Sequence, residues 1–313
     1  MRQSRFLLQL KKSAVFCLAA LLIPYVITLA WTGRAWGSVE KAEKTGRYVI
    51  LDRGSAHIPM ELEEYLLGVL AVQISPETEM EALKAQAILA RTAVRRQMDG
   101  KDEVAESALD MDYLGQGQMK ERWGTTLYPE YEKRLRKAIS ETTGEVVCWN
   151  GDYIEPLFHQ LSAGKTRRGS EDTPYLISVE EPEAVQGENY LSVFLFSGEE
   201  LAKRLNTMTE SPEVTADRMP EEIQIVEKDS AGYVESVLVG QKTYSGDAVR
   251  WALSLPSTAF HFEQAEQGVR CTVKGIGHGY GLDQYVANER AKKGWTAEQI
   301  LNFYYKNIVI VTE

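Results

Sequence analysis

The stretch GVLAVQISPETEMEALKAQAILART, residues 68–92, contains the end of one apolar-periodic segment and the start of another. Apolar residues recur at helical spacing over 58–73, and Gln73 continues their stripe. Ser75 followed by proline is typical of a helix start, so we predict a second helix over 75–97. The spacing places Gln73 between the two helices, facing inward or into a cleft.

The rest of the chain mixes strand and helix signals without a regular β-α alternation. A hairpin is predicted over 144–162, turning through Asn150-Gly151. Ser197 with Glu200, and Thr296 with Gln299, have the spacing of capping boxes for short helices. Further strands are predicted at 48–52, at LSVFLFS (191–197) and on both sides of a Ser-Ala-Gly turn in 223–240, and a short helix is predicted to end at Pro256. We therefore predict an α+β fold, and we find no glycine-rich phosphate loop.

Composition limits the class of protein. The chain has 313 residues and a net charge of −10, with 44% hydrophobic and 26% charged residues. A chain of this kind is globular, and its acidic balance argues against nucleic-acid binding. The three cysteines, Cys17, Cys148 and Cys271, show no CxxC or metal-ligand spacing. A disulfide framework is not expected, although a Cys148–Cys271 bridge stays open.

The N-terminus predicts a membrane anchor. Residues 13–31 carry no charge and are nearly long enough to span a bilayer, whereas 1–12 carry four Arg or Lys residues. We predict a cytoplasmic tail (1–12), a single transmembrane anchor (13–31), a linker (32–47) and an extracytoplasmic domain (48–313). A cleaved signal peptide is the alternative, but its apolar segment is usually shorter.

Three blocks of the sequence resemble the stage II sporulation protein D family of endospore formers. They are residues 58–92, residues 158–183, and residues 246–260 followed by GIGHGYGLDQYVANERAKKGWTAEQILNFYYKN (275–307). The resemblance implies a membrane-anchored α+β domain that cleaves peptidoglycan glycan strands between MurNAc and GlcNAc, leaving 1,6-anhydro ends, during forespore engulfment. It also implies a partner amidase, which removes the stem peptides, and a small multispanning membrane protein that anchors the complex.

Gln73 stands where the family has its proposed catalytic Glu. A lytic transglycosylase needs one group that gives a proton to the leaving oxygen and takes one from the sugar 6-hydroxyl. An amide cannot do this, and losing general acid–base catalysis costs about 10²–10⁴-fold. Three interpretations stay open: a binding or scaffolding protein that positions the amidase, a substitute carboxylate, for which Glu77, Glu79 and Glu81 are nearest, or an active site that is not centred on position 73. Acids near a helix start usually complement the helix dipole.

The resemblance also indicates a set of glycan-binding residues. Some of them have a structural alternative: a helix-surface ion pair for Arg91, a simple hairpin turn for the loop 159–166, and a loop-holding role for His278. Two departures from the family, Asp283 for Ser and Val286 for Gly, lie in the last block. The region of the family's zinc ligands keeps only Asp110 and Asp112, so we predict no metal and no cofactor. The predicted glycan-binding residues are Arg91, His159, Ser162, Lys165, Thr166, His278, Tyr280 and Gln284.

Overall fold

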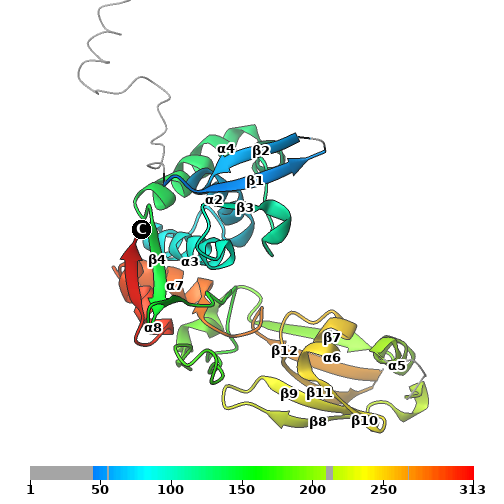
Figure 1. The fold of residues 1–313 in the computed structure, drawn as a ribbon. Coiled ribbons are helices and arrows are strands. Elements are labelled where there is room, and N and C mark those ends of the chain that lie inside the picture. Colours follow the sequence, from blue (N-terminus) through cyan, green and yellow to red (C-terminus); the bar gives the residue numbers. More distant parts are fainter. Residues whose placement is uncertain (1–44, 55, 209–213, 267) are drawn as a thin grey trace, which may run out of the picture. The chain divides into compact units, whose positions relative to one another are not determined.

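The described residues form one compact unit of mixed helices and strands (Figure 1). Within the described part of the chain, no helix is long and apolar enough to cross a membrane. The predicted tail and anchor, 1–31, lie outside the described residues, as does most of the predicted linker. The computed structural model describes residues 45–54, 56–208, 214–266 and 268–313.

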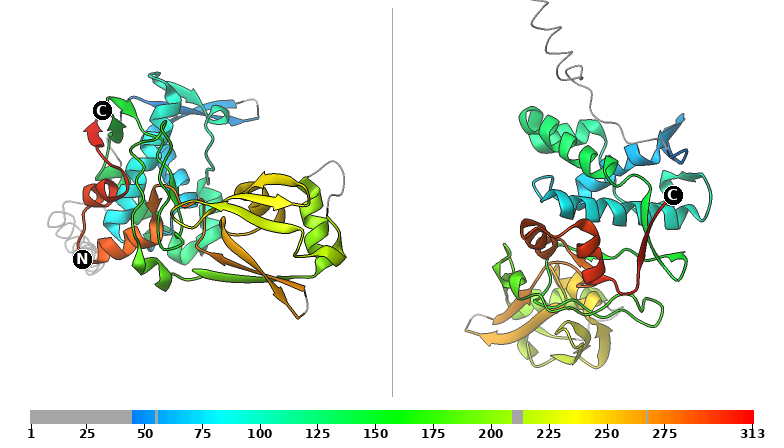
Figure 2. Two further views of the ribbon diagram at one scale, coloured as in Figure 1. Left: turned by 90° about the horizontal axis from the view of Figure 1, so that it is seen from below. Right: turned by 90° about the vertical axis from the view of Figure 1, so that its left-hand side faces the viewer.

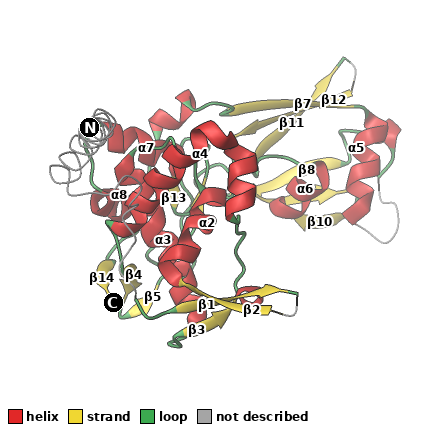
Figure 3. Ribbon diagram, turned by 90° about the horizontal axis from the view of Figure 1, so that it is seen from above, coloured by secondary structure: helices red, strands yellow, loops and turns green. Residues whose placement is uncertain are grey.

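Three helices and a small sheet make one end of the unit (Figures 1 and 3). The sheet has the order β2-β1-β3, with β1 antiparallel to β2 and parallel to β3. Leucines and valines of α2 and α3 are fully buried there, because the two helices bring their apolar stripes together. The elements are β1 (Tyr48–Arg53), β2 (Ala56–Glu61), α2 (Leu62–Gln73), α3 (Met80–Met98), β3 (Glu103–Ala105), η1 (Glu106–Ala108) and α4 (Gln116–Ser140).

Helix α3 contributes to two cores. Leu83, Ala87 and Val94 pack with α2 and α4, whereas Ile88 and Leu89 pack with a second group of elements. That group includes the sheet β14-β4-β5 and the parallel pair β13-β6. Its elements are β4 (Glu145–Trp149), β5 (Asp152–Tyr153), β6 (Phe158–His159), η2 (Pro182–Gln186), β13 (Leu282–Asp283), α7 (Gln284–Lys292), α8 (Ala297–Tyr304) and β14 (Val309–Thr312).

Two antiparallel sheets with two short helices make the other end of the unit (Figures 1 and 2). The sheets have the orders β11-β12-β7 and β10-β9-β8 and enclose a separate apolar core. The elements are β7 (Leu191–Phe196), α5 (Gly198–Leu205), η3 (Asn206–Met208), η4 (Ala216–Arg218), β8 (Ile223–Lys228), β9 (Val234–Val239), β10 (Lys242–Ser245), α6 (Gly246–Leu253), β11 (Ala259–Ala265) and β12 (Gly268–Lys274). The seven described helices and the antiparallel sheets confirm the α+β prediction.

The start of α3 corrects the prediction from Ser75. Residues 75–79 form a turn, and the helix begins at Met80. Arg134 of α4 donates to the carbonyls of Pro76 and Thr78 at 2.7 Å each, which holds these peptide groups outside the helix. The first predicted helix likewise starts later, at Leu62, because 56–61 pairs with β1 as strand β2. The described cysteines, Cys148 and Cys271, are free.

Candidate functional site

A cavity of about 510 Å³ lies where the end of α2, the 74–78 turn, α4 and the start of α7 meet. Cavities that bind small organic ligands commonly have volumes of about 300–1,000 Å³. Amide, aromatic and hydroxyl side chains dominate its walls, which suits a neutral polar ligand. The lining residues are Ala71, Val72, Gln73, Ile74, Ser75, Pro76, Glu77, Thr78, Arg122, Trp123, Tyr131, Gln160, Gln284, Tyr285 and Asn288.

Gln73 ends α2 at this cavity and belongs to a network of three glutamines. Gln86 Nε2 donates to Gln73 Oε1 at 2.9 Å. Gln284 Nε2 donates to the backbone oxygen of Gln73 at 2.8 Å and to Gln86 Oε1 at 3.2 Å. These bonds use the side-chain oxygen of Gln73, and its Nε2 group has no hydrogen-bond partner among the described residues, so it is left to donate to a ligand. The network orients a donor, and it contains no titratable group.

Glu77 is the only carboxylate among the described residues that line the cavity. Its side chain is exposed, and the Tyr131 hydroxyl donates to its Oε1. The hydrogen bond to the Glu77 carboxylate raises the pKa of Tyr131. The other two candidate acids lie outside the cavity lining: the Glu79 side chain is exposed and only its backbone N–H is bonded, to Asn288 Oδ1, whereas Glu81 pairs with Lys84 and caps α8.

A break in α4 brings two further side chains to the cavity. Gly124 has φ 70° and ψ 162° inside the helix, a conformation that favours glycine. Directly before it, Trp123 lines the cavity, and Arg122 donates to the backbone oxygen of Ala71 at 3.1 Å. The sequence prediction missed Trp123 and Tyr131. The Trp-Gly pair was a usable signal, because a glycine within a helix often has a packing or functional reason.

Arg91 lies in the core and not at the cavity, which corrects the expectation that it faces the cleft of Gln73. Its Nε and Nη2 donate to the Glu63 carboxylate at 2.7 and 2.6 Å. Both side chains are 1% exposed, so the whole ion pair is buried. Thr142 and the carbonyls of Ile139 and Glu145 complete the guanidinium contacts. Arg91 therefore joins α2, α3 and the end of α4.

Of the other predicted residues, Gln284 lines the cavity, and the two loop groups lie outside its lining. Ser162 and Thr166 are fully buried, and Lys165 pairs with Glu180 at 2.8 Å. His278 Nδ1 accepts from the Tyr280 backbone N–H at 3.0 Å. The ring of Tyr280 lies 4.5 Å below the Arg167 guanidinium. These contacts pack the segments 161–167 and 278–280 into a framework outside the cavity lining.

Glycines hold the 275–281 segment close to its neighbours. At Gly281, with φ 68°, a Cβ would lie 1.9 Å from the carbonyl oxygen of Leu157. At Gly279, with φ 81°, it would lie 2.4 Å from the Tyr233 ring. Close backbone approach therefore explains these glycines.

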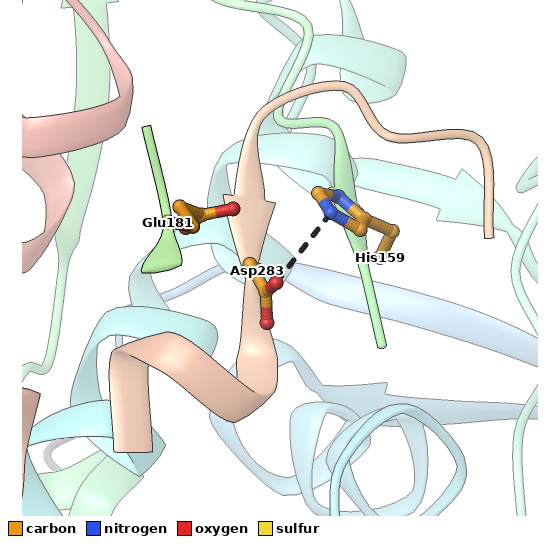
Figure 4. A group of neighbouring side chains, drawn as sticks. All are labelled: His159, Glu181 and Asp283. Carbon is orange, nitrogen blue, oxygen red and sulfur yellow. Dashed lines mark ion pairs between the residues drawn. The ribbon is translucent and has the colours of Figure 1, made fainter. Parts of the chain in front are cut away.

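His159, Glu181 and Asp283 form a buried cluster at this framework (Figure 4). They are 3%, 0% and 0% exposed, and one ligand atom from each lies within 4.8 Å of the others. Burial lowers the pKa of His159 to about 4. Burial, and then the charge of Asp283, raises the pKa of Glu181, partly offset by the Tyr304 hydroxyl. Burial also raises the pKa of Asp283, against backbone N–H groups that lower it.

The sequence prediction placed no metal ligands here. His159 was singled out as a glycan contact and Asp283 as a departure from the family, and Glu181 was not singled out. The acids considered for a metal, Asp110 and Asp112, are exposed. The three clustered residues are 22 or more positions apart along the chain, and no local spacing reveals them.

Comparison with known proteins agrees with the resemblance seen in the sequence. Residues 55–149 match the family model described as Stage II sporulation protein. The chain is 29% identical over 264 residues to "Stage II sporulation protein D" of Bacillus subtilis, covering 80% of this chain and 74% of that protein. It is 27% identical over 327 residues to the protein of the same name from Bacillus amyloliquefaciens, covering 94% of this chain and 93% of that one.

Proposed function

On the premise that this chain is a sporulation protein of the stage II sporulation protein D type, we propose that it binds peptide-free peptidoglycan glycan strands without cutting them. Its binding site is the cavity beside Gln73. The single observation that supports this most is the amide at position 73, held among glutamines where the family's proposed acid is expected.

The chemistry of the cavity suits an uncharged sugar chain. Glutamine and asparagine side chains offer both donors and acceptors to hydroxyl and acetamido groups. Trp123, Tyr131 and Tyr285 add aromatic surface against which the apolar face of a sugar ring packs. A strand without stem peptides carries fewer acidic groups, which reduces repulsion from a chain of net charge −10.

Gln73 cannot act as the general acid–base of glycan cleavage, because an amide neither donates nor recovers a proton near neutral pH. Removing a general acid typically lowers a rate by about 10²–10⁴-fold. Gln73 keeps nearly the shape of a glutamic acid and one free donor group. It therefore retains contacts to the glycosidic region while the proton-transfer step is lost.

The test is direct. The full chain is incubated with amidase-treated glycan strands, and soluble products are analysed for 1,6-anhydro ends while binding is measured by co-sedimentation. We expect binding without anhydro products. Anhydro products from the wild-type chain, absent from a boiled control, would overturn binding without cleavage.

A second candidate function is cleavage with Glu77 as a substitute acid. The observation in its favour is that this carboxylate lines the cavity. Against it, the Glu77 side chain is exposed, and its Oε1 already accepts a hydrogen bond from the Tyr131 hydroxyl. If the wild-type chain does produce anhydro ends, Glu77→Gln should abolish them and Glu79→Gln should not.

The remaining expectations belong to the same proposal. We propose a membrane anchor at 13–31 with the domain 48–313 outside the cytoplasm, and action beside a partner amidase and a multispanning membrane protein during engulfment. Protease accessibility in intact protoplasts tests the orientation. Co-purification of the full chain with an amidase tests the partner. Protection of the domain in intact protoplasts would contradict the proposed orientation.

A further inference from the structure

We infer that His159, Glu181 and Asp283 form a binding site for a divalent transition-metal cation, with Zn²⁺ the best match. The site lies outside the lining of the Gln73 cavity. The proposed metal binding does not depend on whether the chain cleaves glycan strands.

The orientation of His159 is the first argument. Its Nδ1 lies 3.0 Å from the backbone oxygen of Tyr280, so Nδ1 carries the hydrogen and donates it. Nε2 then bears a lone pair, and within the described residues this buried atom has no hydrogen-bond partner. A backbone carbonyl that fixes the tautomer and leaves the other nitrogen free is the usual arrangement of a metal-binding histidine.

The distance from this nitrogen to Asp283 is the second argument. His159 Nε2 and Asp283 Oδ2 are 3.9 Å apart, too far for a hydrogen bond (Figure 4). The exposed pair His57–Asp52 has a ring nitrogen 2.7 Å from its carboxylate. Two ligands at about 2.0–2.2 Å from one tetrahedral zinc ion lie about 3.4 Å apart, so the two atoms would move closer by about 0.5 Å when the ion binds. The distance between His159 Nε2 and Asp283 Oδ2 therefore leaves room for an ion between the two atoms and is too long for the atoms to share a proton.

Glu181 supplies the third ligand. Its Oε1 accepts from the Tyr304 hydroxyl at 2.7 Å, whereas its buried Oε2 has no partner among the described residues. Two fully buried carboxylates close together are costly unless charge is neutralised. A divalent cation would neutralise both and would satisfy the two orphaned atoms. One imidazole with two carboxylates is a donor set that zinc accepts.

The surrounding contacts hold the ligands in place. Ser162 N donates to Asp283 Oδ2 at 2.7 Å, and Val286 N donates to Asp283 Oδ1 at 3.0 Å as part of the α7 N-cap. In metal sites, hydrogen bonds to the ligand side chains commonly fix the orientation of those side chains. A cation here would tie β6, the segment before η2 and the start of α7 together. Gln160 and Gln284, next in sequence to two ligands, line the cavity, so the ion would also stiffen one wall of it.

The experiment uses the full chain, stripped with a chelator, re-exposed to Zn²⁺ during gentle unfolding and refolding, and desalted. Zinc is counted by atomic emission, and Co²⁺ loading is followed by visible absorption. We expect about one tightly held ion per chain and a higher melting temperature when it is bound. Glu181→Gln and Asp283→Asn keep the side-chain shape, and each should weaken binding at least about tenfold.

The control is His57→Gln, which removes the exposed histidine of a histidine–carboxylate pair and should leave binding unchanged. Far-UV circular dichroism identifies variants that fail to fold. The wild-type measurement decides the matter without them: a folded wild-type chain that retains neither zinc nor cobalt overturns the proposal. Folded Glu181→Gln and Asp283→Asn variants that both bind as wild type also overturn it.

Discussion

The neighbouring residues Glu63 and Glu64 give the sharpest stability test. Both lie in the first turn of α2, and each accepts two bonds from one guanidinium. Glu63 meets Arg91 with 1% of each side chain exposed, whereas 42% of the Glu64 side chain is exposed beside Arg136. We predict that Glu63→Gln is far more destabilising than Glu64→Gln.

The magnitudes follow from burial. Glu63→Gln leaves the Arg91 charge in the core with only neutral acceptors, and breaking such a buried pair costs about 3–5 kcal/mol. Arg136 keeps Glu132 as a partner at 2.9 Å, and a half-exposed pair contributes about 1 kcal/mol or less. The difference between the two variants should therefore be at least about 2 kcal/mol.

The assay is urea-induced unfolding of the full chain, followed by tryptophan fluorescence and far-UV circular dichroism with a shared m-value. Glycan binding by the folded fraction of Glu63→Gln should equal that of wild type, because the buried pair is not part of the cavity lining. Equal costs for the two variants would refute the argument, and so would a glycan-binding defect in folded Glu63→Gln.

Three further predictions concern the cavity, the packing of α2 and the response to acid. Trp123→Ala should weaken glycan binding about tenfold, measured by co-sedimentation, because it removes aromatic surface from the cavity. Trp251→Ala, which removes an exposed ring of α6, should have no effect on binding. A larger loss of binding in Trp251→Ala than in Trp123→Ala would contradict the assigned site. Gly68→Ala should cost about 1–3 kcal/mol in thermal unfolding, since its Cβ would lie 2.2 Å from the Tyr113 ring, whereas Gly117→Ala in α4 has open space and should be neutral or stabilising. Burial, helped by the positive charge of His159 when protonated, lowers the pKa of His278 from 6.5 to about 4, so its contribution is complete above about pH 6.5 and falls as the pH drops toward 4. Lowering the pH from about 7 to 5 should then reduce the free energy of unfolding by up to about 2 kcal/mol through this group. A His278→Asn variant that loses as much unfolding free energy on acidification as wild type would disprove the assignment.

Local sequence signals predicted the elements whose structure depends on adjacent residues. The hairpin through Asn150-Gly151 is present, with φ 52° and 95° at the two turn positions. Thr296 and Gln299 form the expected capping box, and Ser197 caps α5. These turns and caps are decided by the backbone preferences and side-chain bonds of a few consecutive residues.

Signals that depend on distant residues could not be read in the same way. Ser75 and proline favour a helix start, but Arg134 binds the following carbonyls and delays it. Helical spacing gave a direction for Arg91 without showing that Glu63 meets it inside the core. Asp283 was recognisable only as an unusual residue, because its cluster partners come from other parts of the chain.

The candidate site was predicted at its centre and missed at its edges. Gln73 and Gln284 line the same cavity. The sequence, in which they lie in two separate blocks, could suggest this proximity but not establish it. Two of the cavity's three aromatic residues, Trp123 and Tyr131, come from α4, where Gly124 interrupts the helix and obscures its periodicity. The loop residues chosen for their polar groups, including Ser162 and Thr166, are used inside the fold.

The central claim is that an amide at position 73 leaves a glycan-binding site without its proton carrier. The most direct measurement compares wild type and Gln73→Glu on amidase-treated glycan strands, scoring bound strand and 1,6-anhydro ends in the same samples. The account predicts similar binding by both, no anhydro ends from wild type, and their appearance with Gln73→Glu. Anhydro ends from the wild-type chain at a rate equal to that of the variant would contradict it.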